Sequence, residues 1–218
     1  VAKGANIDCT TSDEGRTPLF EASWIGAVDA VKILLEMGAN VHLGRTDTAS
    51  TPLHCAAEEN FPEIIRLLVA KGANIDCTTS DEGRTPLFEA SLSGAIDAVK
   101  ILLEMGANVQ LGMTDTAYSP LHCASEKNFP EIIRLLVANG ADIDCVTSDE
   151  GRTPLFRASI FGSIDAVKIL LEMGANVHLG RTDNAYTPLH CAAQKNCPEI
   201  IRLLVAKGAD IDCVTSDE

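Results

Sequence analysis

The chain has few aromatic residues and no long apolar stretch. Only 4% of its 218 residues are aromatic: one Trp, two Tyr and six Phe. Hydrophobic residues nevertheless make up 46% of the chain, so a core has to be built from small aliphatic side chains. No apolar run reaches the roughly 18 residues that a membrane-spanning helix needs. We therefore expect no membrane insertion within this segment.

Basic residues are also scarce. Lys and Arg number 17 against 31 Asp and Glu, which gives a formal charge of -14 and a pI near 4.7. Nucleic-acid binding needs a basic face, because its affinity comes from the release of counterions from phosphates. The composition therefore argues against a nucleic-acid partner. A basic or neutral protein partner suits this charge better.

The sequence also lacks the cysteine spacings that are typical of metal sites and of disulfide frameworks. There is no C-x-x-C, and the one close pair, Cys191 and Cys197, has no second pair beside it. All cysteines except Cys197 recur at one constant interval in two series, which are Cys55, Cys123 and Cys191, and Cys9, Cys77, Cys145 and Cys213. Stacked repeats would hold like positions about 20 Å apart, whereas a disulfide needs roughly 4.4 to 6.8 Å between Cα atoms. We expect buried or half-buried thiols, no metal or other cofactor, and a reducing, cytoplasmic location.

What the sequence has in abundance is internal repetition. A Thr/Ser-Pro-Leu tripeptide begins at Thr17 and again at Thr51, Thr85, Ser119, Thr153 and Thr187, a period of about 34 residues. Pairs of repeats form a double repeat of twice that length, and such periodicity is typical of one supersecondary element stacked many times. The sequence therefore predicts a single array over residues 1–218, made of a half repeat 1–16 and the repeats 17–50, 51–84, 85–118, 119–152, 153–186 and 187–218.

The residue pattern within each repeat predicts two short helices followed by a loop. In the first, Thr17 is placed to cap a helix over Pro18–Trp24, and Pro is favoured in the first turn of a helix. A second apolar stripe predicts a helix over 28–37, and Gly38 suits its left-handed end. Residues 39–50 show no helical pattern and indicate a projecting, hairpin-like loop. Helices this short are marginal alone, so each must be stabilised by its neighbours.

These motifs resemble the ankyrin repeat, with TPLH at 51–54 and 187–190, SPLH at 119–122, LLVAKGANID at 67–76 and LLEMGANVH at 34–42. The resemblance covers essentially the whole chain and implies an all-α solenoid of stacked helix-turn-helix repeats with projecting β-hairpin-like loops. The usual ankyrin period is exceeded by one loop residue. Phe20, Phe88 and Phe156 stand where the family has His, so alternate repeats should lack the usual Thr-to-His hydrogen bonds. The tetratricopeptide repeat has the same period, but it needs an aromatic signature that is absent here.

Nothing in the repeats predicts catalysis. His54 precedes Cys55, and the same pair recurs around Cys123 and Cys191, but adjacent helical residues point about 100° apart, a poor geometry for a nucleophile and its base. We interpret the histidines as structural. The Asp81-Glu82 tip supplies too few ligands for calcium and is interpreted as a solvated turn. The chain is therefore not expected to be an enzyme.

The near-identical copies differ at two groups of positions. One group lies at the first-helix ends: Trp24, Ile25, Glu58, Glu59, Leu92, Ser93, Glu126, Lys127, Ile160, Phe161, Gln194 and Lys195. The other lies in the loops: Arg45, Met113 and Arg181, with Ser50, Tyr118 and Tyr186. The resemblance implies that these positions line a concave face that binds partners. Neutral drift is the alternative, but drift on a wet surface should seldom select Trp, Ile and Phe.

The sequence is compatible with two functions. The first is a protein–protein interaction scaffold that binds its partner on the concave face. The second is structural, because residues 1–14 nearly duplicate 205–218 and neither end carries a distinct polar cap. The chain would then be a fragment of a longer array or the subunit of a head-to-tail filament.

Overall fold

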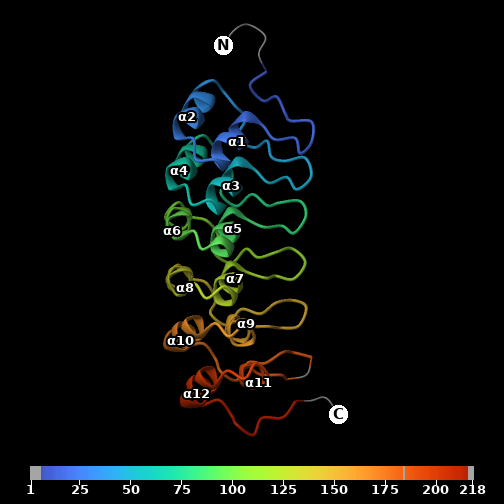
Figure 1. Cartoon of the computed structure of the whole chain (residues 1–218), viewed down its shortest axis with the longest axis vertical. Helices are drawn as coiled ribbons and strands as arrows, with labels where there is room; N and C mark the ends of the chain where they lie inside the picture. The colour runs from blue at the N-terminus through green and yellow to red at the C-terminus, as the bar shows by residue number, and fades with distance from the viewer. Residues whose placement is uncertain (1–5, 184, 216–218) are drawn as a thin grey trace. The chain divides into compact units, whose positions relative to one another are not determined.

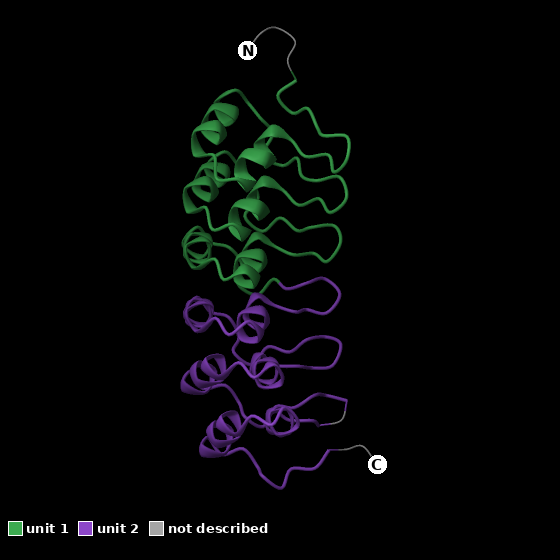
Figure 2. Ribbon diagram, in the orientation of Figure 1, with its two compact units in different colours: residues 1–111 green, residues 112–218 purple. Residues whose placement is uncertain are grey.

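The structure, a computed structural model, describes residues 6–183 and 185–215. Residues 1–5 of the predicted half repeat, Asn184 in the loop of repeat 153–186 and residues 216–218 of the last repeat lie outside the described residues. The chain divides into two compact units, Val1–Leu111 and Gly112–Glu218, which Figure 2 colours separately.

The described residues form helices in pairs and contain no strand. The N-terminal unit holds α1 (Pro18–Trp24), α2 (Val28–Glu36), α3 (Pro52–Glu58), α4 (Pro62–Ala70), α5 (Pro86–Ser93) and α6 (Ile96–Glu104). The C-terminal unit holds α7 (Pro120–Glu126), α8 (Pro130–Ala138), α9 (Pro154–Phe161), α10 (Ile164–Glu172), α11 (Pro188–Gln194) and α12 (Pro198–Ala206). The predicted all-α repeat architecture is confirmed. The second helix of the first repeat ends one residue earlier than predicted, because Met37 caps it.

Within each unit the helices stack in two rows (Figure 1). First helices pack on first helices, as α1 does on α3 and α3 on α5, and second helices pack on second helices. Leu53, Ile64 and Leu68 are fully buried between the rows. Aliphatic side chains make most of the core, as the scarcity of aromatic residues predicts, and Phe20, Phe88 and Phe156 are its buried aromatic residues. Helices of 7 to 9 residues gain their stability from this packing.

Two different caps begin the first helices. In α1 the Thr17 Oγ1 accepts a hydrogen bond from the Phe20 backbone N–H at 3.1 Å. In α3 the His54 ring takes part: its Nδ1 accepts from the Thr51 N–H at 3.1 Å, and its Nε2 lies 3.0 Å from the Arg84 carbonyl oxygen. The histidine bonds are thus confined to alternate repeats, as the Phe substitutions predict.

The segments that join one repeat to the next project on the side of the first helices as fingers (Figure 1). Each finger is a series of turns, in which the Arg45 N–H bonds the Ser50 carbonyl at 2.9 Å. Neighbouring fingers are joined directly, since the Thr46 N–H donates to the Glu14 carbonyl at 3.0 Å. Gly15 has a positive φ of 68°, and a Cβ there would collide with Thr46. Adjacent fingers therefore lie in a defined register.

All eight cysteines are free, and seven of them are buried or half-buried. The prediction is wrong for Cys9, which is exposed. In the same series the Cys77 thiol lies 3.5 Å from the hydroxyl of Thr51, the residue that begins the same repeat. The described residues include none at the equivalent position for Cys9, so its thiol lacks this cover.

Candidate functional site

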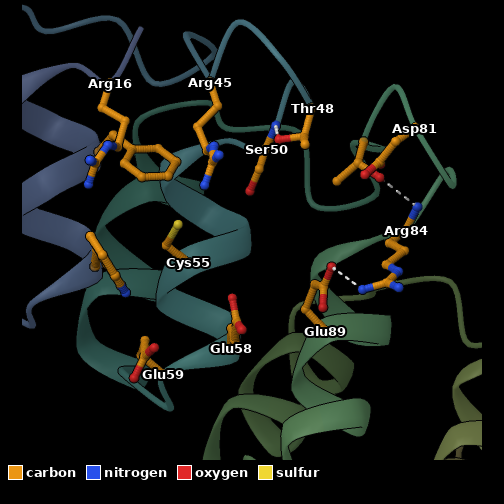
Figure 3. A pocket seen from close by; sticks show the side chains of 13 residues that line it. Arg16, Arg45, Thr48, Ser50, Cys55, Glu58, Glu59, Asp81, Arg84 and Glu89 are labelled. Atoms are coloured by element: carbon orange, nitrogen blue, oxygen red, sulfur yellow. Dashed lines mark hydrogen bonds and ion pairs between the residues drawn. The ribbon is translucent and has the colours of Figure 1, made fainter. Parts of the chain in front are cut away.

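A cavity of about 410 Å³ opens in the N-terminal unit between the first helices and the fingers (Figure 3). Its walls come from three repeats. Phe20 and Trp24 belong to α1, Cys55 and Glu58 to α3, and Glu89 to α5. The remaining lining residues are Glu59, which follows α3, and the finger residues Arg16, Arg45, Thr48, Ser50, Thr79, Asp81 and Arg84. We refer to this cavity as the N-terminal groove.

The groove brings together several of the positions that the copies vary. Trp24, Arg45, Glu58 and Glu59 all line it, together with Ser50. The other variable positions of this unit are not among its lining residues: Ile25 is 71% exposed, Leu92 half-buried and Ser93 exposed. None of the variable positions in either unit is buried.

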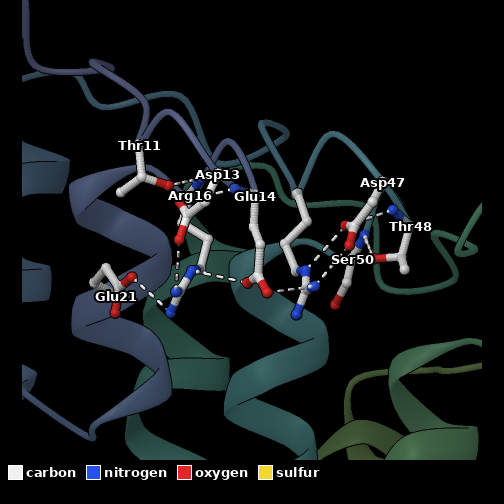
Figure 4. Close-up of polar contacts among 9 residues, drawn as sticks. Thr11, Asp13, Glu14, Arg16, Glu21, Asp47, Thr48 and Ser50 are labelled. Carbon is white, nitrogen blue, oxygen red and sulfur yellow. Dashed lines mark hydrogen bonds and ion pairs between the residues drawn. The ribbon is translucent and has the colours of Figure 1, made fainter.

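Two of the groove arginines are held by carboxylates of the fingers and of α1 (Figure 4). Arg16 Nη1 lies 2.9 Å from Glu21 Oε1, and its Nε lies 3.1 Å from Glu14 Oε2. Arg45 Nη2 lies 2.7 Å from Asp47 Oδ2 and 3.2 Å from Glu14 Oε1. The Arg45 hydrogen bond holds the pKa of Asp47 down at about 2. Both guanidinium charges are therefore compensated inside the protein.

The positive charge of the third groove arginine is compensated as well. Arg84 pairs with Glu82, and its Nη1 lies 3.6 Å from Glu89 Oε1 on α5 (Figure 3). Burial raises the pKa of Glu89, while the positive charge of Arg84 opposes that rise. Each groove arginine thus faces two carboxylates or more.

Glu58 and Glu59 are not held by ion pairs in this way. Among the residues that the structure describes, neither has a basic side chain within ion-pair distance. Burial raises the pKa of Glu58, the neighbouring Glu59 charge adds to the rise, and the positive charge of Arg84 opposes it. The Trp24 side chain stays 43% exposed beside them, with the Arg16 guanidinium 5.3 Å from its ring centroid. The uncompensated charge of the groove is therefore negative.

At the equivalent positions of the C-terminal unit, side chains of the protein itself occupy the site. One double repeat further along the chain, Glu126 corresponds to Glu58, while Tyr118 replaces Ser50 and Arg157 replaces Glu89. The Tyr118 hydroxyl donates to Glu126 Oε2 at 2.6 Å, and the Arg157 guanidinium pairs with the same carboxylate. Burial by itself would raise the pKa of Glu126, but the hydrogen bonds from Tyr118 and Arg157 and the positive charges of Arg157 and Lys127 together lower it.

Aromatic rings complete this C-terminal cluster. The Arg157 guanidinium carbon lies 4.9 Å from the Tyr118 ring centroid and 4.9 Å from the Phe161 ring centroid. The predicted contact residues Tyr118, Glu126 and Phe161 are thus brought together around one arginine. Lys127 Nζ lies 3.7 Å from the other Glu126 carboxylate oxygen.

The remaining variable positions of the C-terminal unit do not join that cluster. Arg181 pairs with Asp183, and its Nη2 lies 3.1 Å from Glu150 Oε2. The Tyr186 ring packs edge-on to the Phe156 ring, with 6.5 Å between their centroids. The others differ in exposure: Met113 and Ile160 are half-buried, whereas Gln194 and Lys195 are exposed.

A second hollow of about 410 Å³ lies in the C-terminal unit between the turns of the last two repeats. Phe161, Gly162, Lys195 and Cys197 are among the residues that line it. Cys197 stands where the repeat 51–84 has Phe61, whose ring lies against Gly26 so closely that a Cβ there would overlap it. Nothing lies within 4 Å of the corresponding Cβ position at Gly162. The hollow is the space that a missing phenyl ring leaves.

A Cys–His contact that sequence reasoning missed lies beneath the fingers. The Cys77 Sγ lies 3.8 Å from His54 Nδ1, and the same sequence spacing joins Cys145 to His122. This recurring spacing was the available signal. Both His54 ring nitrogens are engaged in the fold, and burial raises the pKa of Cys77. The thiol is therefore unsuited to act as a nucleophile.

Comparisons with known proteins agree with this architecture. Sequence models described as "Ankyrin repeats (3 copies)" match residues 42–113 and 121–215, and one described as "Ankyrin repeats (many copies)" matches residues 1–35. The chain belongs to the ankyrin-repeat family. The crystal structure of the human ASB11 ankyrin repeat domain is 35% identical to this ankyrin-repeat chain and superposes with a TM-score of 0.81. The match covers 92% of this chain and 88% of that domain. No curated protein sequence matches the chain significantly.

Ankyrin repeats generally serve as protein–protein interaction modules, and the family is typically not enzymatic. In the part of the chain that the structure describes, no helix is both long and apolar enough to cross a bilayer. No three His, Cys, Asp or Glu side chains of these residues gather into a metal-binding group.

Proposed function

We propose that this ankyrin-repeat protein is an interaction scaffold that binds a basic or neutral partner on the face formed by its first-helix ends and fingers. The observation that carries the proposal is the exposure of large apolar side chains at those helix ends. Trp24 is 43%, Ile25 71% and Phe161 54% exposed. Exposed aromatic side chains are frequent anchors of protein interfaces, and apolar side chains cost free energy when they stay hydrated.

The surroundings of these side chains support the same face. Charged and polar variable positions, such as Glu58, Glu59 and Lys127, occupy the same helix ends in neighbouring repeats and are exposed. An apolar centre with a polar rim is the usual composition of an interface. We attribute no catalysis to this face, because its thiols and histidines are engaged in the fold.

The proposal is tested by cross-linking followed by affinity measurement. A photo-reactive residue at position 25 or 161 captures the partner in cells, and the purified partner is then titrated against variants. We expect Trp24→Ala and Phe161→Ala each to weaken binding about tenfold or more, as loss of an aromatic anchor does. Ile33→Ala is the matched control, since Ile33 is 55% exposed on α2, away from the fingers. Equal affinity for all three variants would contradict the proposal.

Head-to-tail self-association is a second candidate. It is favoured by the apolar side chains of the last described repeat, because Ile211 is 70% and Val214 82% exposed. A second copy could cover them by stacking as the repeats stack within each unit. Light scattering over a hundredfold range of concentration tests this idea, and a constant monomeric mass would exclude it.

A further inference from the structure

We propose that the N-terminal groove is a seat for an arginine side chain of the partner. This inference rests on the proposed scaffold function and names the chemistry that one part of the interface recognises. The two units carry the same site in a filled and an open form.

The C-terminal unit holds its own arginine at this site. Arg157 pairs with the Glu126 carboxylate, and its guanidinium lies over the rings of Tyr118 and Phe161. A planar guanidinium matches a carboxylate in geometry and also stacks on aromatic rings. At this position of the repeat, the protein itself pairs the carboxylate with an arginine.

In the N-terminal unit the carboxylate remains and its cation is gone. Glu58 corresponds to Glu126, but Glu89 replaces the arginine and Ser50 replaces the tyrosine. Both replacements line the groove of about 410 Å³, which lies within the size range of ligand pockets. The smaller Ser50 side chain opens the space, and Glu89 removes the internal positive charge.

The charge balance of the groove selects a cation over an anion. Arg16, Arg45 and Arg84 are each held by two or more carboxylates, so they offer little to an incoming anion. Glu58 and Glu59 have no basic partner within ion-pair distance among the described residues. An incoming guanidinium would meet the Glu58 carboxylate and would share the part-exposed Trp24 ring with Arg16, whose guanidinium lies 5.3 Å from the ring centroid; cation–π attraction is strongest for Trp.

Trp24 is the only tryptophan of the chain and lines the groove, so its fluorescence reports directly on the site. The probe is the peptide acetyl-Ala-Ala-Arg-Ala-Ala-amide, titrated into the full chain. We expect a saturable change in emission, with binding about tenfold tighter than that of the same peptide carrying neutral citrulline. A lysine peptide that binds as tightly as the arginine peptide would overturn the assignment to arginine. Equal binding of the citrulline peptide would overturn the seat itself.

Variants of the groove complete the test. Glu58→Gln keeps the side-chain size and is expected to weaken the arginine peptide about tenfold. The double variant Ser50→Tyr with Glu89→Arg copies the filled site of the C-terminal unit and should abolish binding. Glu36→Gln on α2 makes the same change of net charge outside the groove and should leave binding unchanged. Circular dichroism and the thermal midpoint verify that each variant is folded, and peptide binding that survives the double variant would overturn the seat.

The captured partner separates this inference from the scaffold proposal. If Glu58→Gln and the double variant bind the partner normally while Trp24→Ala and Phe161→Ala do not, the scaffold stands and the arginine seat is wrong. If Trp24→Ala and Phe161→Ala bind the partner normally, the scaffold face is wrong. Peptide binding that responds to Glu58→Gln would then still support a seat for arginine in the groove.

Discussion

The Asn128 side-chain oxygen accepts a hydrogen bond of 2.9 Å from the backbone N–H of Ala166, which belongs to the next repeat. Ala166 lies in the first turn of α10, whose own N-cap residue, Ser163, makes no side-chain cap. One of the free N–H groups at that helix end is thus capped by the preceding repeat. Asn60 does the same for Ala98 in the N-terminal unit, at 2.8 Å. One side chain therefore links two neighbouring repeats.

Replacing Asn128 separates its two roles. Its φ of 60° is costly for residues other than Gly, Asn and Asp, and its side chain supplies the cap. We expect Asn128→Gly to lower the free energy of unfolding by about 1 kcal/mol through the lost hydrogen bond. Asn128→Ala should cost about 1 kcal/mol more, because it adds backbone strain. Urea denaturation measures both, and an alanine variant as stable as the glycine variant would contradict the assignment.

The C-terminal hollow can be filled by one substitution. Cys197 precedes α12 with φ and ψ of -107° and 85°, close to the -105° and 78° of Phe61 before α4, so the backbone accepts phenylalanine. We expect Cys197→Phe to raise the free energy of unfolding by about 1 kcal/mol through apolar burial. Chemical denaturation measures the change. Cys9→Phe is the control, since Cys9 is exposed and should gain nothing. A destabilised Cys197→Phe variant would show that the hollow cannot take a ring.

Stability should depend on pH through the buried histidines. Burial lowers the pKa of His122 from 6.5 to about 4. Below pH 6.5 the unfolded chain binds a proton at this histidine, whereas the folded chain does not. The contribution of His122 to the free energy of unfolding is therefore fully present above pH 6.5 and is lost as the pH falls toward 4. The loss between pH 6.5 and 5.5 should be about 1 kcal/mol for this residue.

His122→Gln tests the assignment, because glutamine at this position of a helix can keep the capping box but does not titrate. We expect the variant to show a shallower decline of unfolding free energy between pH 6.5 and 5.5 than the unmodified protein. His42→Gln changes an exposed histidine and should leave the decline as it is. Parallel declines in all three proteins would refute the role of His122.

The thiols should differ widely in reactivity. Cys9 is exposed, whereas burial raises the pKa of Cys55 and of Cys191 to about 12. Alkylation requires the thiolate, so the buried thiols should react only when the protein unfolds. A brief pulse of iodoacetamide at pH 8, read by mass spectrometry, should label Cys9 first. Labelling of Cys191 at the same rate in the native protein would contradict its burial.

The local elements of this fold follow from short-range signals. Thr17 with Pro18 marks a helix start, and Gly38 marks a helix end, because capping and left-handed backbone depend only on neighbouring residues. The predicted burial of Cys9 failed for the opposite reason, since cover for a thiol of this series comes from a residue 26 positions earlier in the chain. The Cys77–His54 contact was missed because it also joins residues far apart in the chain.

The candidate site divides in the same way. Comparison of the copies singled out Trp24, Arg45, Glu58 and Glu59, because substitutions among near-identical repeats are visible without coordinates. It could not indicate which of their charges are compensated. Arg16 and Arg45 are held by carboxylates from their own and neighbouring segments, and only the coordinates show that Glu58 has no such partner among the described residues.

The sequence by itself determined the repeat, its helices and the positions at which the copies vary, since periodicity and capping are written in consecutive residues. Only the tertiary structure decided that one double repeat holds its own arginine against a carboxylate while the other leaves the equivalent carboxylate open. Electrostatic and packing free energies depend on distances across repeats. The exchange of Ser50 for Tyr118 at the equivalent position changes which side chains come into contact, but it does not alter the helical pattern.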